Sequence, residues 1–107
     1  MKLIFLNITP NDSLKVSNYL RKMPVYFCKI ASIGGIISSG SYTYLIKVND
    51  ELLDEIIKNL IVICKTRKIR INTINNVEMS MFHNISTTQK EGGASLFVVD
   101  LEQFIKV

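Results

Sequence analysis

The sequence has little of what a catalytic, secreted or membrane-spanning protein needs. Its single histidine, His83, lies in a polar stretch, and no pattern of neighbouring groups supports a His-centred acid–base pair or triad. No apolar run approaches the roughly 20 residues of a membrane helix. Residues 1–7 are too short for the apolar core of a signal peptide and lack a small-residue cleavage site. We therefore expect a cytoplasmic protein without catalytic machinery.

Cysteine is also scarce, and its spacing fits neither a metal site nor a redox motif. The two cysteines, Cys28 and Cys64, lie far apart on a predicted strand and a predicted helix. Without a secretory signal, free thiols are expected, and Cys64 is interpreted as a packing residue. Four acidic residues at a predicted helix start match the helix dipole, with cation ligation as the alternative: Asp50, Glu51, Asp54 and Glu55. No cofactor and no metal are predicted.

Charged residues make up only 21% of the 107 residues, whereas hydrophobic residues make up 48%. This composition excludes a disordered chain and predicts a single domain over residues 1–107. The surplus of apolar residues over charged ones indicates a buried subunit interface. The net charge of +4 suits an anionic small ligand, or weak contact with nucleic acid.

Hydrophobic periodicity predicts short strands alternating with two helices. Asn11 or Asp12 is expected to cap the first helix, and Pro24 to end it. In that helix Val16, Tyr19 and Leu20, with Met23, form one apolar stripe. The predicted strands are 2–8, 25–32, 42–48, 68–74 and 94–99, with a helix from residue 49 or 50 to 64, a long polar connection over 75–91 and one helical turn over 101–104. The order β-α-β-β-α-(β)-β predicts an α+β fold of the ferredoxin-like βαββαβ type.

A sheet with both helices on one face leaves its other face to be covered. Residues 42–46 are apolar almost without interruption, which indicates that the second face is buried too, most simply by another subunit.

The connection over residues 33–41 is rich in glycine and carries two isoleucines at its tip. It is not a P-loop, because no Gly-Lys-Ser/Thr follows and no helix begins there. Gly34, Gly35 and Gly40 permit close approach of a ligand to backbone N–H groups. Ile36 and Ile37 need a cover, which a planar base or a neighbouring subunit would supply equally well.

A basic stretch follows the second helix, with Lys65, Arg67, Lys68 and Arg70. It is interpreted as a solvated face, and attraction of phosphates is the alternative. The strand signature of an RNA-binding ferredoxin-like module has only a faint echo at residues 93–98, so RNA binding is the minor hypothesis.

Several runs resemble one family in their motifs and spacing. They are residues 28–46 (CKIASIGGIISSGSYTYLI), residues 48–56 with Cys64 and Arg67, and residues 91–98 (EGGASLFV). Together they resemble the PII-like cyclic-di-AMP receptor proteins, the PstA type, over nearly the whole chain. The resemblance implies a ferredoxin-like, PII-like subunit in a homotrimer, with a flexible T-loop-like segment at about 72–90. It also implies a cytoplasmic signalling protein that binds cyclic-di-AMP, or a related nucleotide, in clefts between subunits. Loop rearrangement is then read by an unknown downstream protein, without catalysis. No membrane partner is predicted, and nucleic acid stays the minor hypothesis.

The resemblance carries the ligand site over unevenly. Gly34, Gly35, Gly40 and Phe97 match the family, and Ile37 replaces its leucine. The departures are Tyr26 for arginine, Cys28 for threonine, Ile36 for phenylalanine, Ser41 for asparagine, Lys47 for glycine and Lys106 for glutamine. Lys47 either attracts phosphate or fills the space a glycine leaves, and Tyr26 offers a new stacking surface. The alternative is a PII-like trimer that has lost cyclic-di-AMP binding and senses another small anion, or acts as a protein-interaction scaffold.

Overall fold

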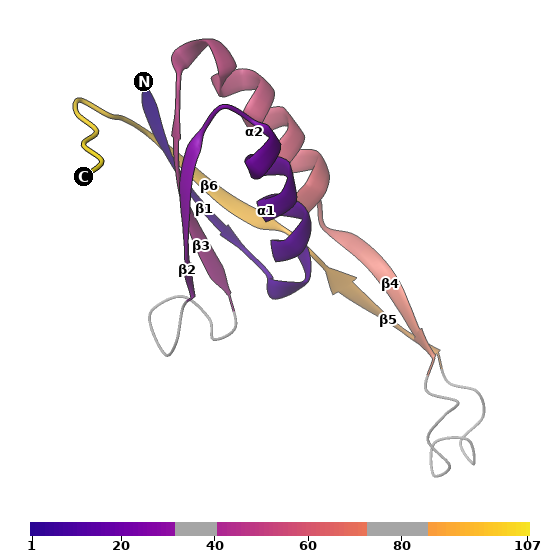
Figure 1. Cartoon of the computed structure of the whole chain (residues 1–107). Helices are drawn as coiled ribbons and strands as arrows, with labels where there is room; N and C mark the ends of the chain where they lie inside the picture. Colours follow the sequence, from indigo (N-terminus) through magenta and orange to yellow (C-terminus); the bar gives the residue numbers. More distant parts are fainter. Residues whose placement is uncertain (32–40, 73–85) are drawn as a thin grey trace.

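A computed structural model describes residues 1–31, 41–72 and 86–107, and it shows a small α+β domain (Figure 1). The first half contains β1 (Lys2–Ile8), a short 3-10 turn (Pro10–Asp12), α1 (Ser13–Lys22), β2 (Tyr26–Ala31) and β3 (Tyr42–Val48). The second half contains α2 (Asp50–Cys64), β4 (Arg67–Asn72), β5 (Ser86–Glu91) and β6 (Ala94–Asp100). The predicted strand 42–48 has the same bounds as β3, and the helix predicted to follow a cap at Asn49 or Asp50 and to reach Cys64 is α2, with Asn49 at its N-cap position.

Four strands form an antiparallel sheet in the order β2-β3-β1-β6. Both helices lie on one face of it (Figure 1). This arrangement is compatible with the predicted ferredoxin-like fold.

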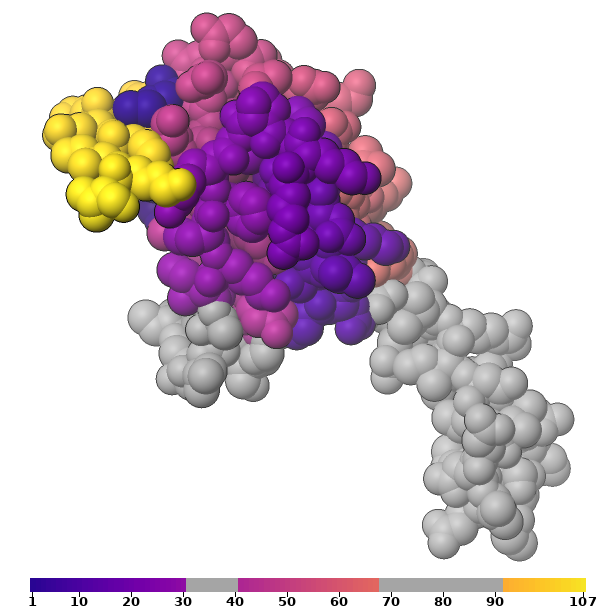
Figure 2. Space-filling model, in the orientation of Figure 1, coloured from indigo at the N-terminus to yellow at the C-terminus, as the bar shows by residue number. Residues whose placement is uncertain are grey.

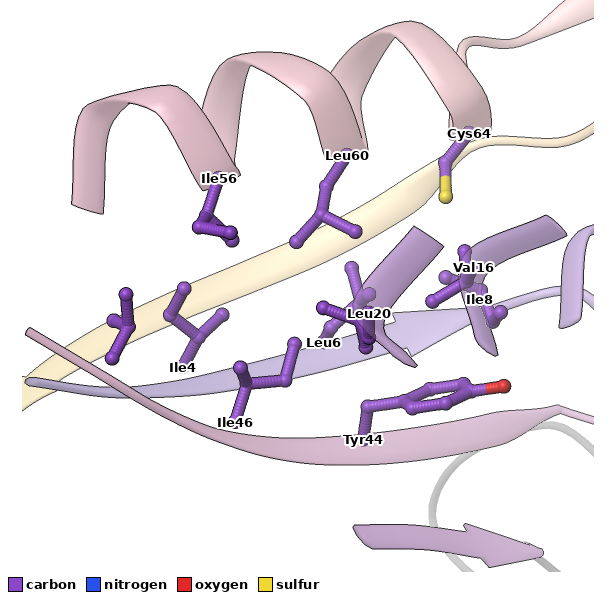
Figure 3. Packing of buried hydrophobic residues seen from close by; sticks show 11 residues of the cluster. Ile4, Leu6, Ile8, Val16, Leu20, Tyr44, Ile46, Ile56, Leu60 and Cys64 are labelled. Atoms are coloured by element: carbon purple, nitrogen blue, oxygen red, sulfur yellow. The ribbon is translucent and has the colours of Figure 1, made fainter. Parts of the chain in front are cut away.

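The core lies between the sheet and the two helices because alternate strand residues point to that face. Ile4 and Leu6 of β1 and Ile46 of β3 point toward Ile56 and Leu60 of α2 (Figure 3). The remaining members of the buried cluster are Ile8, Val16, Leu20, Tyr44, Val48 and Cys64. The predicted stripe of α1 is therefore confirmed at its centre, where Val16 and Leu20 are fully buried.

Tyr44 joins the sheet to α1 through a buried polar contact. Its hydroxyl oxygen lies 2.9 Å from Ser13 Oγ and 2.7 Å from Ser17 Oγ. It also lies 3.1 Å from the carbonyl oxygen of Ser13. Ser13 and Ser17 are four residues apart, so they share one face of the helix. These bonds satisfy a hydroxyl that would otherwise be buried without a partner.

The predicted long connection over 75–91 is wrong in its second half. Residues 86–91 form β5, which pairs with β4 from Arg67 opposite Glu91 to Asn72 opposite Ser86. The two strands make a separate ribbon that extends from the end of the main sheet (Figure 1). The sequence Ser-Thr-Thr-Gln-Lys-Glu has no apolar alternation, so a search for hydrophobic period cannot find a strand held by backbone pairing. Residues 73–85, with His83, lie outside the described residues.

The predicted helical turn over 101–104 is also wrong. Residues 101–107 have no regular structure and lie on the side of the sheet opposite the helices (Figure 1). The backbone N–H of Leu101 donates to the carbonyl oxygen of Met1 at 3.2 Å. Aromatic contacts farther along the tail, described below, take the place of helical hydrogen bonds.

Candidate functional site

The sheet face opposite the helices, here called the outer face, carries a continuous apolar surface. The strand register sets its side chains in cross-strand rows. One row runs Cys28, Leu45, Phe5, Phe97 from β2 to β6, and the next runs Tyr26, Lys47, Leu3, Val99. Phe97 is 64% exposed and Val99 43% exposed, so this face has no cover from the chain itself over β6. Exposed apolar side chains grouped in this way are typical of contact surfaces in other proteins.

Four of the predicted ligand residues lie on the outer face. Tyr26 and Cys28 come from β2, Lys47 from β3 and Phe97 from β6. Ser41 directly precedes β3 and is buried, with its Oγ 3.3 Å from Asn7 Nδ2. The other predicted residues, Gly34, Gly35, Ile36, Ile37 and Gly40, lie outside the described residues.

Within one chain, the five predicted residues that the structure describes do not converge on one pocket. Cys28 and Phe97 lie on the two edge strands, three strand spacings or roughly 14 Å apart. Ser41 and Lys47 lie at opposite ends of β3, roughly 20 Å apart along the strand. Only Tyr26 and Lys47 are direct neighbours, as cross-strand partners.

The C-terminal residues cover the Tyr26 end of the outer face. The Phe104 ring packs on the Tyr26 ring with centroids 4.9 Å apart and planes tilted by 55°. Lys47 Nζ lies 4.7 Å from the centroid of Phe104, and Lys106 Nζ lies 5.3 Å from the centroid of Tyr26. Two ammonium groups thus cap two packed aromatic rings, a favourable cation–π arrangement. Tyr26, Lys47, Phe104 and Lys106 are called the tail cluster below.

Sequence reasoning missed Phe104. The segment from 101 to 104 fits a helical turn by composition alone, and only the tertiary contact with Tyr26 decides against it. The sequence offers one signal for this site, the aromatic Phe104 two positions before Lys106. That pattern is too common in proteins to identify a site.

A small polar cavity lies at the opposite end of the sheet. Its volume is about 170 Å³, and it is lined by Asn7, Ile8, Thr9, Ser41, Gly93, Ala94 and Ser95. The Thr9 hydroxyl oxygen is buried and has no hydrogen-bond partner among the described residues. Small-molecule sites usually occupy roughly 300–1,000 Å³. This cavity is therefore too small for a cyclic dinucleotide and suits at most one of its groups.

A buried ion pair holds the base of the ribbon. Arg67, the first residue of β4, donates from Nη2 to Asp12 Oδ1 at 2.7 Å, and Asp12 is fully buried. Arg67 Nη1 also donates to the carbonyl oxygen of Lys65 at 3.3 Å. Asp12 sits at the N-cap position of α1 as predicted, but its side chain makes no capping hydrogen bond. The expectation of a solvated or phosphate-attracting Arg67 is likewise replaced by this internal pair.

The end of α2 meets the start of β6 beside that pair. The Gly93 N–H donates to the carbonyl oxygen of Cys64 at 2.6 Å, and the positive φ angles of Gly92 and Gly93, 87° and 94°, form the predicted turn before β6. Burial raises the pKa of the Cys64 thiol to about 11, and the Asp12 carboxylate adds to the rise while Arg67 opposes it. Cys64 is a buried free thiol, as predicted, whereas Cys28 is an exposed one.

The whole sequence, residues 1–107, matches the family model described as "Cyclic-di-AMP receptor". The chain belongs to the cyclic-di-AMP receptor family. No protein of curated function matches it. Among solved structures, it is similar to a functionally unknown protein from Pediococcus pentosaceus ATCC 25745, with a TM-score of 0.79 and 21% sequence identity. The alignment covers 99% of this chain and 96% of that one, and at this identity it supports the fold alone.

Within residues 1–31, 41–72 and 86–107, no group of three or more His, Cys, Asp or Glu side chains is placed to hold a metal ion. No helix in the same ranges is long and apolar enough to cross a membrane.

Proposed function

We propose that the receptor is a PII-like signalling protein that assembles as a homotrimer and binds cyclic-di-AMP in clefts between subunits. The family match over residues 1–107 carries the ligand assignment. The exposed apolar outer face supports the assembly, because a second copy packed on it would bury Phe97 and its neighbours.

The spacing of the predicted ligand residues favours a site shared by two subunits. Cys28 and Phe97 lie too far apart for one small cleft in one chain, and the cavity beside Ser41 is too small for the whole ligand. Packing one subunit's β6 edge near another's β2 edge would bring Phe97 close to Tyr26 and Cys28. The glycine-rich segment around Gly34, Gly35 and Gly40, with Ile36 and Ile37, would complete that cleft.

The signalling step is proposed to use the T-loop-like segment at about 72–90, which a downstream protein reads. Arg67 and Gly93 at the base of the ribbon lie beside α1, α2 and the cavity near Ser41, so a ligand at that end acts on residues next to the ribbon. The receptor carries out no catalysis in this proposal and works in the cytoplasm.

Titration calorimetry with cyclic-di-AMP, cyclic-di-GMP, ATP and a short RNA, together with light scattering for the oligomeric state, tests the proposal. We expect a trimer that binds cyclic-di-AMP with the highest affinity of the four. A folded trimer that gives no heat with any of them defeats the ligand assignment and leaves the scaffold alternative. A monomer defeats the shared site.

Two charge reversals give a matched comparison. Lys47→Glu changes the outer face, whereas Lys29→Glu makes the same change in charge on β2, at a position whose register partner, Tyr44, faces the helices. A charge-assisted contact to phosphate is worth about 1.5–3 kcal/mol, so Lys47→Glu should weaken binding by at least about tenfold. Lys29→Glu should change it by no more than about twofold. Gly35→Val should abolish binding and leave the trimer intact, and equal effects of the two reversals would place the site elsewhere.

A further inference from the structure

The tail cluster carries two positive charges that no carboxylate neutralises within the described residues. Three ion pairs are present in those residues, and their cations are the Met1 amino group, Lys2 and Arg67. Lys47 and Lys106 instead lie over aromatic rings. Two like charges held on adjacent rings repel one another, and an anion placed between them would remove that cost.

Phe104 fills one face of Tyr26 in this arrangement. Its ring lies 4.9 Å from the Tyr26 ring, a distance at which aromatic rings attract one another, and Lys47 caps it. A purine base is also a flat aromatic ring, and it stacks on an aromatic side chain at least as strongly as phenylalanine does. The cluster therefore combines a stacking surface for a base with two cations for phosphate. The tilted Phe104 ring occupies part of that stacking surface, and Tyr26 is still 42% exposed.

We propose that Phe104 competes with the ligand in the free protein, so that the C-terminal tail, residues 101–107, must leave Tyr26 before a base can stack there. This inference rests on the proposed function, since the competitor it names is an adenine of cyclic-di-AMP. Departure of Phe104 also uncovers Lys47, which then meets a phosphate of the ligand instead of a ring.

The tail is held in a way that permits such a movement. Its first residue is fixed by the backbone hydrogen bond from Leu101 to Met1. Beyond that bond the side chains are largely in solvent, with Ile105 70% exposed and Val107 fully exposed. Phe104 is half-buried and packs on Tyr26, and the Lys47 and Lys106 ammonium groups lie over the same two rings. These ring contacts hold the tail, which lies at one edge of the molecule (Figure 2). Breaking them frees the segment, with Leu101 as the pivot.

Two alanine variants separate competition from direct ligand contact. Phe104→Ala removes the competing ring, and Ile105→Ala shortens the exposed neighbour as the matched control. Calorimetry with cyclic-di-AMP should show Phe104→Ala binding about 3- to 10-fold tighter than the parent, the factor that corresponds to one aromatic pair. Ile105→Ala should bind within about twofold of the parent, because that side chain makes no packed contact.

Weaker binding in Phe104→Ala would show that the ring contacts the ligand directly, and unchanged binding would show that it does not compete. Either result overturns the inference and leaves the proposed function standing. Absence of cyclic-di-AMP binding in the parent and in Phe104→Ala defeats the proposed function itself. Binding in Phe104→Ala alone confirms both.

Fluorine NMR gives a readout independent of affinity. In protein labelled with 4-fluorophenylalanine, the signal lost in Phe104→Ala identifies this ring. Addition of cyclic-di-AMP should move that signal from a packed to a solvent-like position. A bound state in which the Phe104 signal keeps its packed position contradicts the displacement. Far-UV circular dichroism of both variants checks that the fold is unchanged.

Discussion

The Asp12–Arg67 pair gives the sharpest test of how the ribbon is fixed to the body. Arg67→Met keeps much of the length of the side chain and removes its charge. The Asp12 side chain has no exposed surface and that of Arg67 is 35% exposed, so the substitution leaves a carboxylate buried without its cation. Removing one partner of a buried pair costs about 3–5 kcal/mol. Because Arg67 is partly in solvent, we expect the lower end, about 3 kcal/mol, in the free energy of unfolding.

A double variant isolates the cause of that loss. Asp12→Asn combined with Arg67→Met removes both charges, so it should recover at least about 1 kcal/mol relative to Arg67→Met alone. Urea unfolding followed by circular dichroism measures each free energy. Arg21→Met is the control. Within residues 1–31, 41–72 and 86–107, Arg21 bonds only to Asn18 on an exposed helix surface, so its loss should cost under about 0.5 kcal/mol. Strict additivity in the double variant, or a loss no larger than that of Arg21→Met, would refute the role assigned to the pair.

Four further tests address the glycine turn, the two thiols and the buried tyrosine. An alanine Cβ at Gly92 would lie 2.7 Å from a guanidinium nitrogen and 2.8 Å from a backbone oxygen, whereas at Gly93 its one close contact is a side-chain hydroxyl at 3.0 Å. Both substitutions incur the strain of a positive φ, about 1–2 kcal/mol. The clash at Gly92 comes in addition, so Gly92→Ala should destabilise the protein by about 1–3 kcal/mol more than Gly93→Ala in urea unfolding. Equal losses of stability contradict the clash. Iodoacetamide with mass spectrometry should label exposed Cys28 and spare Cys64 in the folded protein. The pKa of Cys64 rises from 9.0 to about 11 on folding, so the folded state favours the protonated thiol. The free energy of unfolding therefore has its full value below pH 9 and falls as the pH rises toward 11, because the thiol ionises first in the unfolded chain. The fall in the free energy of unfolding, about 2–3 kcal/mol, should be absent from Cys64→Ala. If the parent and Cys64→Ala lose stability in parallel as the pH rises, the Cys64 thiol is not the cause. Tyr44→Phe should cost about 1–3 kcal/mol in the same unfolding assay because it strands two buried serine hydroxyls, and a neutral result would show that these hydroxyls find other partners.

The sequence predicts those elements whose apolar residues meet the core. Residues 50–64 repeat apolar side chains at helical spacing, and residues 42–48 are rich in β-branched and aromatic types, so the helix and the strand are both found where the sequence predicts them. β5 has neither property and is held by backbone bonds to β4. No local pattern predicts that partner, since cross-strand pairing depends on where the two segments meet in space.

The contacts that shape the candidate site are equally non-local. Asp12 and Arg67 are separated by most of the chain, and each alone has a common local explanation, as a helix cap and as a surface cation. Tyr26 and Phe104 are separated even further. Motif resemblance places Tyr26, Cys28, Lys47 and Phe97 as candidates, and the register then shows that they share one face. It takes the strand order to show that Cys28 and Phe97 lie on the two edge strands of that face.

A hydrogen bond and an ion pair link the polar cavity to the ribbon. Gly93 lines the cavity beside Ser41, and its N–H donates to the carbonyl oxygen of Cys64, the last residue of α2. Arg67 lies three residues after Cys64 and is the first residue of β4. Its ion pair with Asp12 fixes it to the start of α1. The Gly92–Gly93 turn connects β5 to β6, and Gly93 forms part of the cavity wall. A group that enters the cavity therefore contacts this turn. Any shift of this turn changes the hydrogen bond at Cys64, and with it the anchor of β4. In the proposed mechanism, the glycine turn and the Asp12–Arg67 ion pair connect the ligand to the ribbon. Substitutions of Arg67 and Gly92 should therefore alter both the movement of the ribbon and the stability of the fold.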